Sequence, residues 1–349
     1  MDIAVYKSSL LALSISIICT PLLLRFSRRK GLFASINHRS SHDASVPNTG
    51  GIILGFAVLL PLILFSDYPN QKEFSLLISA FAVLLITGII DDFNPIPVAY
   101  KFLGQFIPAI VIVTSIDEQD LVIPFINEFI QLPFFFNYLF WIVFIVMSIN
   151  AFNLIDGIDG LAIGLGIIGG VFYFLQFYRW EVLDLMIFST ALSFGLLGLF
   201  FFNISKKFKI FIGDTGSLLI GGLLVFFALR FVSLPESESI SGSFFMVIGS
   251  VFIPLADLIR LTLVRIVHKE SPFKADRQHI HHLLLDLLKG SHMLTTNILL
   301  ISQLGVIVLF QSLADQKSIY LISILVLSLA LYFGAAHILT YARGKLKKT

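Results

Sequence analysis

FNYLFWIVFIVMSINAFNLIDGIDGLAIGLGIIGGVFYFLQFY, residues 136–178, consists of two apolar runs joined by an acidic turn. The runs cover residues 136–152 and 160–178, and roughly 16–23 apolar residues suffice to cross a bilayer as a helix. The turn between them carries Asn153, Asp156 and Asp159. Carboxylates this close to hydrocarbon are costly, and they persist where they face a metal, a substrate or one another. The stretch therefore predicts a helical hairpin in a membrane, with a turn that has a chemical role.

Long apolar runs of this kind extend over the whole chain. Of the 349 residues, 57% are hydrophobic and 13% are charged, whereas soluble domains carry about 25% charged residues. We predict an all-α, polytopic integral membrane bundle of about eleven transmembrane helices, forming a single membrane-embedded domain over residues 1–349. The predicted spans are residues 8–26, 50–66, 74–90, 102–116, 136–152, 160–178, 183–202, 217–232, 244–265, 295–313 and 318–341. Residues 121–133, which contain two prolines, are expected to form a surface hairpin or an interfacial stretch.

The distribution of basic residues orients these spans. With the N-terminus outside and the C-terminus in the cytoplasm, the inner loops and the tail hold 19 of the 24 Lys and Arg residues. The opposite orientation would invert this ratio, against the general excess of Lys and Arg in cytoplasmic loops. In the favoured orientation, residues 266–294 form the longest cytoplasmic loop. The single cysteine, Cys19, excludes a disulfide framework within the chain.

Four short polar motifs then lie on the cytoplasmic face. They are residues 88–92 (GIIDD), 153–160 (NLIDGIDG), 211–217 (FIGDTGS) and 276–282 (DRQHIHH). A random scatter of polar residues would not place all four on one side of the membrane. We therefore predict one active site at the cytoplasmic edge of the bundle.

Asp91 and Asp92 end the third predicted span, and Lys101 opens the fourth. Adjacent positions on a helix diverge by about 100°, so the two carboxylates are expected to differ in role. One would bind a metal or act as a base, and a neighbour would hold the other. Lys101 is either a phosphate ligand or an interfacial anchor. The structural alternative is a solvated helix end, which needs a compensating cation because carboxylates there oppose the helix dipole.

Asp156 and Asp159 are three residues apart and would share a face if their turn is helical. Asn153 adds an amide on the same side. Such a set could bind a metal, a ribose or a base edge. The structural alternative is a helix–helix turn with an aspartate as a cap.

Residues 211–217 form a glycine-rich turn that leads into the eighth span. Free N–H groups at a helix start favour anions, but Asp214 there favours a cation that could bridge to phosphates. No lysine follows the glycines, so this is not a P-loop. The structural alternative is again a helix cap.

His279, His281 and His282 follow Arg277 closely. Three imidazoles and a guanidinium can hydrogen-bond the oxygens of a phosphate or a sugar. A zinc site is the competing functional interpretation, weakened by the absence of cysteine ligands. The plainest alternative is a polar cytoplasmic turn.

Together the motifs suit a reaction with much negative charge and a reactant in the lipid. Two phosphorylated reactants repel each other. A divalent cation, with Lys, Arg and His side chains, would offset that repulsion and stabilise a phosphoryl group in transfer.

Over nearly its whole length the sequence resembles the polyprenyl-phosphate N-acetylhexosamine-1-phosphate transferases of glycosyltransferase family 4. The resemblance lies in residues 90–92 (IDD) with 101–105 (KFLGQ), 153–162 (NLIDGIDGLA), 211–217 (FIGDTGS) and 279–282 (HIHH). It implies transfer of N-acetylhexosamine-1-phosphate from a UDP-sugar to undecaprenyl phosphate, with release of UMP. It also implies Mg²⁺, with Mn²⁺ as a substitute, in a multi-pass protein of the bacterial inner membrane.

The resemblance further implies a role for each motif. Asp214 resembles the principal Mg²⁺ ligand of the family, with Asp91 as a second metal ligand or as the base for the lipid phosphate and Asp92 in support. The family's nucleotide side is matched by Asn153, Asp156, Asp159 and, for stacking on uracil, Phe211. The family's contacts to pyrophosphate and sugar are matched by Arg277, His279, His281 and His282, and Lys101, within the matched residues 101–105, is a candidate substrate-binding residue. Direct attack by the lipid phosphate and a covalent aspartyl intermediate both remain open at this point.

The HIHH form resembles the branch that starts O-antigen, enterobacterial common antigen or teichoic acid linkage units, so UDP-GlcNAc is the favoured donor. The branch that uses UDP-N-acetylmuramoyl-pentapeptide has three consecutive histidines instead, and that donor is the alternative. One departure lies in the first cytoplasmic loop, where the family's basic pair and Pro-Arg are replaced by residues 39–42 (RSSH) and 47–51 (PNTGG). A phosphate or sugar contact there is either absent or supplied by another segment.

A secondary transporter is the alternative from another functional class, because transporters also use broken spans and carboxylates in the membrane. Transporters place these groups near the midplane and often show duplicated halves, whereas these motifs lie at the cytoplasmic ends of spans without a visible repeat. The expected partners are the UDP-sugar, the polyprenyl phosphate and membrane lipid. A homodimer is compatible with the sequence, and nothing in it suggests nucleic-acid binding.

Overall fold

The computed structural model describes residues 2–30, 46–67, 71–117, 121, 123, 133–234, 242–271 and 277–346. Within these ranges the chain forms thirteen helices and no strand. The helices are α1 (Ile3–Lys30), α2 (Gly50–Phe65), α3 (Gln71–Phe93), α4 (Val98–Thr114), α6 (Phe134–Ile155), α7 (Leu161–Arg179), α8 (Leu183–Asn203), α9 (Gly213–Val232), α10 (Ser243–Ser250), α11 (Phe252–Val267), α12 (Ile280–Leu287), α13 (His292–Ser312) and α14 (Ser318–Leu346). The prediction of an all-α membrane bundle is confirmed.

The eleven predicted spans all coincide with helices. Eight described helices are long and apolar enough to cross a membrane, and the bent pair α10–α11 would make a ninth. The shorter apolar helices α2 and α4 account for the other two predicted spans. Most of the predicted surface segment 121–133 and the first-loop residues 39–42 lie outside the described residues.

The prediction of one continuous span over residues 244–265 is wrong, because α10 and α11 meet at an angle of 77°. Pro254 explains the break, since a proline has no N–H and its ring clashes with the carbonyl of the preceding turn. Gln303 of α13 satisfies the backbone groups that the break releases. Its amide accepts a hydrogen bond from Ile253 N–H (3.0 Å) and donates one to the Gly249 carbonyl (2.6 Å). The bend is therefore built into the packing of α13.

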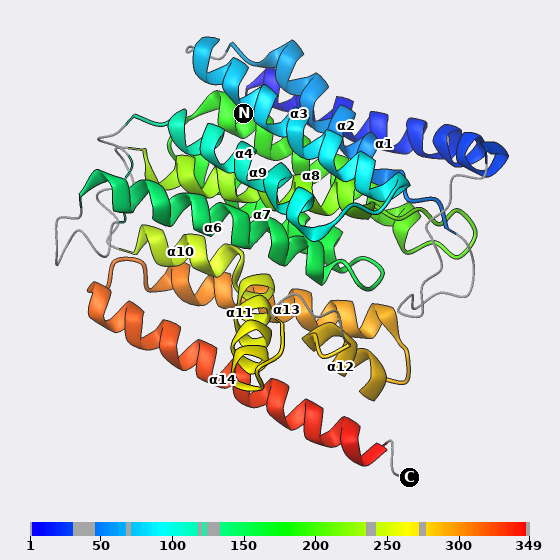
Figure 1. Cartoon of the computed structure of the whole chain (residues 1–349). Helices are drawn as coiled ribbons and strands as arrows, with labels where there is room; N and C mark the ends of the chain where they lie inside the picture. Colours follow the sequence, from blue (N-terminus) through cyan, green and yellow to red (C-terminus); the bar gives the residue numbers. More distant parts are fainter. Residues whose placement is uncertain are drawn as a thin grey trace.

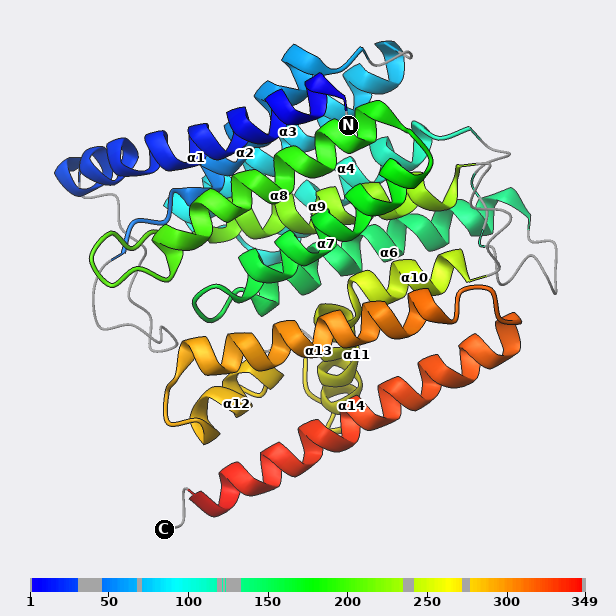
Figure 2. The same ribbon diagram turned by 180° about the vertical axis from the view of Figure 1, so that it is seen from behind.

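Helix α9 forms the centre of the bundle. It packs against α2, α3, α6 and α7, and 94% of its apolar stretch is buried. Figures 1 and 2 show it surrounded by these helices from both sides, whereas α13 and α14 lie along one flank with α11 running steeply between them. Only 11% of the apolar stretch of α14 is buried. The core is thus concentrated around α9, and the C-terminal helices form a thinner outer layer.

The polar motifs gather at one end of this bundle. The C-terminal end of α1, the loop before α9, helix α12 and the C-terminus all lie toward the right of Figure 1. The α8–α9 and α6–α7 connections therefore lie at the same end as the histidine-bearing helix α12.

Candidate active site

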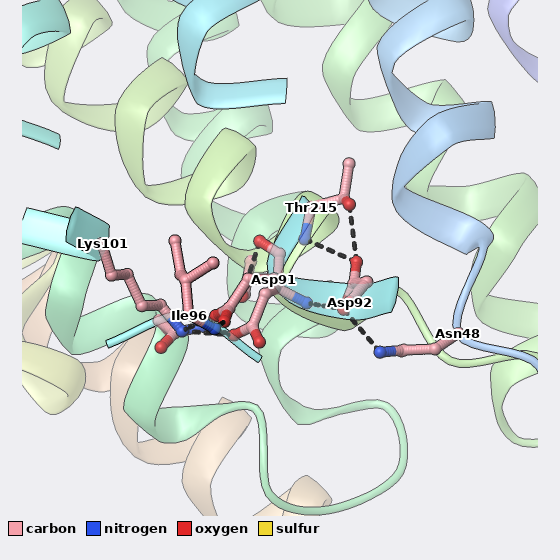
Figure 3. A network of polar contacts seen from close by, with 9 residues as sticks. Asn48, Asp91, Asp92, Ile96, Lys101 and Thr215 are labelled. Carbon is pink, nitrogen blue, oxygen red and sulfur yellow. Dashed lines mark hydrogen bonds and ion pairs between the residues drawn. The ribbon is translucent and has the colours of Figure 1, made fainter. Parts of the chain in front are cut away.

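Lys101 links two of the predicted carboxylates. Its ammonium lies 2.7 Å from Asp91 Oδ2 and 2.8 Å from Asp214 Oδ1. Asp91 also accepts a hydrogen bond from Ile96 N–H (2.9 Å), so the chain that leaves α3 wraps around its carboxylate (Figure 3). Lys101 is therefore more than an interfacial anchor: it is the cation between two acids from α3 and α9.

Asp92 points the other way and caps the start of α9. Its carboxylate accepts hydrogen bonds from Asp214 N–H (2.8 Å), Thr215 N–H (2.9 Å) and the Thr215 hydroxyl (2.6 Å). Asn48 adds a fourth donor at 2.5 Å (Figure 3). The N–H groups that could have received an anion are thus occupied by a side chain. Asp92 fixes the backbone that carries Asp214, and the predicted divergence between Asp91 and Asp92 is observed.

A glycine lets α3 approach α9 closely enough for this cap. A Cβ added to Gly88 would stand 2.3 Å from Thr215 Cα. Any side chain there would push the two helices apart and lengthen the bonds from Asp92. The glycine that opens the first motif is therefore a packing requirement of the site.

The segment before α2 holds the glycine-rich turn from its other side. Gly50 and Gly51 N–H donate to the carbonyls of Phe211 and Ile212, each at 2.9 Å, and Phe211 N–H donates to the Pro47 carbonyl at 2.9 Å. This is the described part of the region in which the sequence departs from the family pattern. Asn48, which stands in that departure, contacts Asp92.

Asn153 and Asp156 approach Asp214 from α6 and its end. The Asn153 amide donates hydrogen bonds to Asp214 Oδ1 and to Ser217 Oγ, the second at 2.9 Å. Asp156 makes no hydrogen bond with the described residues. Burial, together with the nearby charges of Asp214, Asp92 and Asp159, raises the pKa of Asp156 well above its ordinary value of 3.8.

The turn after Asp156 is not helical, because α6 ends at Ile155 and α7 begins at Leu161. The condition under which Asp156 and Asp159 would share a helix face is therefore not met. Asp159 instead lies 2.5 Å from Lys209 Nζ and 3.4 Å from His292 Nδ1. The glycines of the turn release the chain from the helix and send the two carboxylates to different neighbours.

Lys209 joins Asp159 to the predicted stacking residue. Its ammonium lies 5.7 Å from the centre of the Phe211 ring, within the range of a cation–π contact. The sequence indicated Lys209 only as one of the basic residues in a cytoplasmic loop, and it gave no signal for His292. Both positions depend on how the loop before α9 and the start of α13 fold over the turn.

The three predicted histidines form one cluster at the start of α12. His281 is fully buried, its ring centre is 5.6 Å from that of His279 and 4.2 Å from that of His282, and neither of its nitrogens has a hydrogen-bond partner among the described residues. A Cβ added to Gly157 would stand 2.3 Å from His281 Nε2. This contact joins the histidine cluster to the acidic turn.

Burial keeps two of these imidazoles neutral. It lowers the pKa of His282 to about 4, with the charges of Arg277 and His279 as further causes. The pKa of His281 is also well below 6.5, first through burial and then through His282 and His279. At neutral pH both rings therefore act as neutral hydrogen-bonding groups.

The sequence did not single out Asp257 and Arg260 of α11, which hold the histidine cluster. Asp257 Oδ2 lies 2.7 Å from His279 Nδ1, and Asp257 Oδ1 lies 2.9 Å from Arg260 Nη2. The available signal was an acid and a base three residues apart in an apolar run, a spacing that places both on one helix face. From the sequence, Arg260 was counted only among the basic residues that orient the spans.

A second polar group fixes Arg277 at the other side of α12. Asp286 lies 3.3 Å from Arg277 Nη2 and 2.6 Å from Arg343 Nη2, and Arg343 Nη1 donates to the Arg277 carbonyl at 2.8 Å. Arg343 comes from the end of α14. Asp276, the first residue of the motif, lies outside the described residues.

The predicted site residues therefore assemble into two groups that meet at Gly157. The carboxylate group consists of Asp91, Asp92, Lys101, Asn153, Asp156 and Asp214, and the imidazole group consists of Arg277, His279, His281 and His282. Asp159 and Phe211 lie beside the first group through Lys209. In the described part of the chain, no three His, Cys, Asp or Glu side chains are arranged to hold a metal ion.

The chain is similar in sequence to a known family and to several named proteins. The profile of glycosyl transferase family 4 matches residues 74–232, which run from α3 to the end of α9. A probable undecaprenyl-phosphate N-acetylglucosaminyl 1-phosphate transferase of Bacillus subtilis is 31% identical over 273 residues, covering 77% of this chain and 74% of that protein. A phospho-N-acetylmuramoyl-pentapeptide-transferase of Staphylococcus epidermidis is 30% identical over 302 residues, covering 79% and 90%. An undecaprenyl-phosphate alpha-N-acetylglucosaminyl 1-phosphate transferase of Escherichia coli O157:H7 is 29% identical over 283 residues, covering 76% and 73%.

Proposed function

Because the chain belongs to glycosyl transferase family 4, we propose that it transfers N-acetylhexosamine-1-phosphate from a UDP-sugar to undecaprenyl phosphate. GlcNAc-1-phosphate is the favoured group, in line with the names of the Bacillus subtilis and Escherichia coli relatives. In the reaction, an oxygen of the lipid phosphate bonds to the phosphorus of the sugar phosphate. The bond from that phosphorus to the bridging oxygen breaks, and UMP leaves.

The observation that carries the proposal is the sharing of Lys101 by Asp91 and Asp214 at the polar end of the bundle. A lipid phosphate enters from the membrane and must meet a nucleotide that comes from water. Lys101 opens α4 and supplies a cation at this boundary. Asp91 is placed next to it, where it can hold a proton or orient the lipid phosphate.

The carboxylate group also fits the magnesium ion that we propose as cofactor. Asp91, Asp156 and Asp214 outnumber their one cation, Lys101, and Asp156 makes no hydrogen bond with the described residues. Mg²⁺ keeps several waters and takes one or two carboxylates together with substrate phosphates. Asp214 and Asp91 would hold the ion. It would supply charge neutralisation between the two phosphorylated substrates.

The nucleotide is proposed to lie over the acidic turn and Phe211. The Phe211 ring is partly exposed, and an aromatic face can stack on uracil. Lys209 lies over that ring while it pairs with Asp159. Arg277 and the histidines would then meet the pyrophosphate and sugar from the side of α12.

The protein is a multi-pass membrane protein, and we propose that it lies in the bacterial inner membrane with its site facing the cytoplasm. Support comes from the bias of Lys and Arg residues and from the position of both polar groups at the end of the bundle that this bias assigns to the cytoplasm. UDP-sugars are made in the cytoplasm, so this orientation also suits the donor.

The test is UMP release by the purified protein with undecaprenyl phosphate and Mg²⁺. A panel of UDP-sugars is run with and without EDTA, beside Asp214→Asn and a control, Glu73→Gln. Glu73 pairs with Arg230 (3.1 Å) at the other end of α3, so this control should keep its activity. Release with one donor, lost on chelation and in Asp214→Asn, supports the proposal. Folded protein that releases no UMP with any donor contradicts it.

A second donor is kept in the panel for a specific reason. The Staphylococcus epidermidis relative is named a phospho-N-acetylmuramoyl-pentapeptide-transferase and is matched over 90% of its length. UMP release with UDP-N-acetylmuramoyl-pentapeptide and none with UDP-GlcNAc would reverse our choice. Family membership gives no support to the transporter alternative.

A further inference from the structure

Asp257 receives three hydrogen bonds from three different groups. Its Oδ1 accepts Arg260 Nη2–H (2.9 Å) and Ile280 N–H (3.1 Å), and its Oδ2 lies 2.7 Å from His279 Nδ1. The carboxylate is 1% exposed. A buried carboxylate with this many donors is held in one orientation.

One of these contacts, together with a further bond from Arg260, docks α12 on α11. Ile280 is the first residue of α12, so Asp257 takes the place of an N-terminal cap, supplied from another helix. Arg260 also donates to the Gln278 carbonyl at 2.6 Å, which fixes the chain just before the cap. The peptide units on both sides of His279 are therefore tied to α11.

The third contact determines which ring nitrogen of His279 carries the hydrogen. An ionised carboxylate has no hydrogen to donate, so the bond at 2.7 Å requires the hydrogen on His279 Nδ1. In the neutral ring this leaves Nε2 as an acceptor, and in the charged ring Nε2 is a donor. Nε2 makes no hydrogen bond among the described residues.

We propose that Asp257, held by Arg260, is a positioning residue that keeps His279 in the Nδ1–H form and presents Nε2 to the donor pyrophosphate. The identity of the group that Nε2 contacts rests on the proposed function. The tautomer of His279 and the docking of α12 do not depend on that function. No other described carboxylate contacts the His279 ring, so Asp257 alone determines its hydrogen-bonding state.

The other charged and titratable groups around His279 are few. Arg260 comes from the same helix as Asp257, and Tyr332 approaches Asp257 from α14. His281 and His282 lie beside the ring on α12, with centres at 5.6 and 6.5 Å, and Arg277 precedes it. Both neighbouring imidazoles are neutral at pH 7 because burial lowers their pKa values.

Asp257→Asn tests the tautomer directly. The amide oxygen must continue to face Arg260 and Ile280, because neither of these can give up its hydrogen. The amide NH₂ then faces His279 Nδ1, and the ring must move its hydrogen to Nε2. We expect kcat/KM for UMP release to fall roughly 10- to 100-fold, as for other carboxylate partners of functional histidines.

The tautomer has its own readout, which does not need turnover. Nitrogen-15 labelling of histidine, with His279→Gln to identify the signal, reports whether Nδ1 or Nε2 carries the hydrogen. Nδ1–H in the wild type and Nε2–H in Asp257→Asn support the proposal. The same Nδ1–H signal in both proteins overturns it. If the wild type releases no UMP with any donor, the proposed function fails while this measurement still decides the tautomer.

Two further variants separate positioning from folding. Glu73→Gln is the matched control, because Glu73 is also a buried carboxylate paired with an arginine but lies about 27 Å from Asp91, at the other end of α3; it should keep the wild-type activity. His279→Asn keeps an N–H toward Asp257 but removes Nε2. A stable His279→Asn protein that loses activity supports the proposal even if Asp257→Asn does not fold. Wild-type activity in His279→Asn overturns it.

Discussion

The carboxylate group and the imidazole group are built in opposite ways. The first lies where α3, α4 and α6 meet the central helix α9, and it consists of acids that share Lys101. The second is carried by the short helix α12, which α11 and α14 hold through Asp257 and Asp286. The bundle places the carboxylate group, whereas a few polar contacts place the imidazole group. We therefore expect activity to depend on the charge of the carboxylates and on the docking of α12, which places the histidines.

The largest expected effect is loss of charge in the carboxylate group. Asp214→Asn and Asp91→Asn should each lower UMP release by at least about 1000-fold, because each removes an anion that faces the charged substrates and would hold the metal. Asp184→Asn is the control, since its carboxylate accepts the Ser66 hydroxyl (2.6 Å) away from the site. Thermal unfolding should show folded protein in all three cases. Full activity in either site variant would remove the carboxylate group from the reaction.

The next largest effect is expected from a substitution at Gly157, where the carboxylate group and the imidazole group meet. Gly157→Ala would place a methyl group 2.3 Å from His281 Nε2, in a ring that is fully buried and has no free space. A displacement of α12 by about 1 Å should cost roughly 100-fold in kcat/KM. Gly305→Ala on α13 is the matched control, because a Cβ there meets nothing within 4 Å. Equal activity of the two variants would show that the groups do not need this contact.

The imidazole group should also make stability depend on pH. Burial lowers the pKa of His282 from 6.5 to about 4, so the unfolded chain binds this proton more readily than the folded one. The stabilisation is complete above pH 6.5 and is lost as the pH falls from 6.5 toward 4. Between pH 7 and pH 5 the loss should be about 2 kcal/mol, and His282→Gln should remove that part of it. The measurement is the difference in unfolding free energy between the two proteins at both pH values; parallel curves would contradict the buried neutral ring.

The smallest expected effect concerns the edge of the carboxylate group. Phe211→Ala should raise the KM for the UDP-sugar by about tenfold and change kcat less, because stacking on a base contributes about 1–3 kcal/mol. Phe208→Ala is the control, since Phe208 is exposed in the same loop. An unchanged KM in Phe211→Ala would mean that uracil binds elsewhere.

Much of this architecture followed from the sequence because it depends on local patterns. Long apolar runs predicted where the apolar helices lie, apart from the break within residues 244–265, and the charge bias together with the four motifs predicted one polar end. Pro254 was visible in the ninth run, but a proline alone does not say whether a membrane helix breaks. The partner that stabilises the break, Gln303, lies 50 residues further along the chain.

The sequence predicted most residues of the site, but few of the groups that these residues contact. Asp91 and Asp92 were expected to differ in role, yet the amides that Asp92 caps belong to α9, 122 and 123 residues away. Asp257 and Lys209 were missed because an isolated polar residue looks the same whether it faces solvent or a histidine. Their roles depend on how helices dock, and docking is decided by packing that no local pattern records.

Helix α9 has a further consequence for how the protein is made. Its mean hydropathy of 1.9 is close to the 2.2 of α14, yet 94% of its apolar stretch is buried against 11% for α14. A membrane-insertion machinery recognises apolarity and releases both segments into lipid, and helices associate only afterwards. The apolar character of α9 thus serves a stage of biosynthesis that the finished bundle no longer shows. Substitutions that make α9 more polar would therefore oppose its insertion as well as its packing.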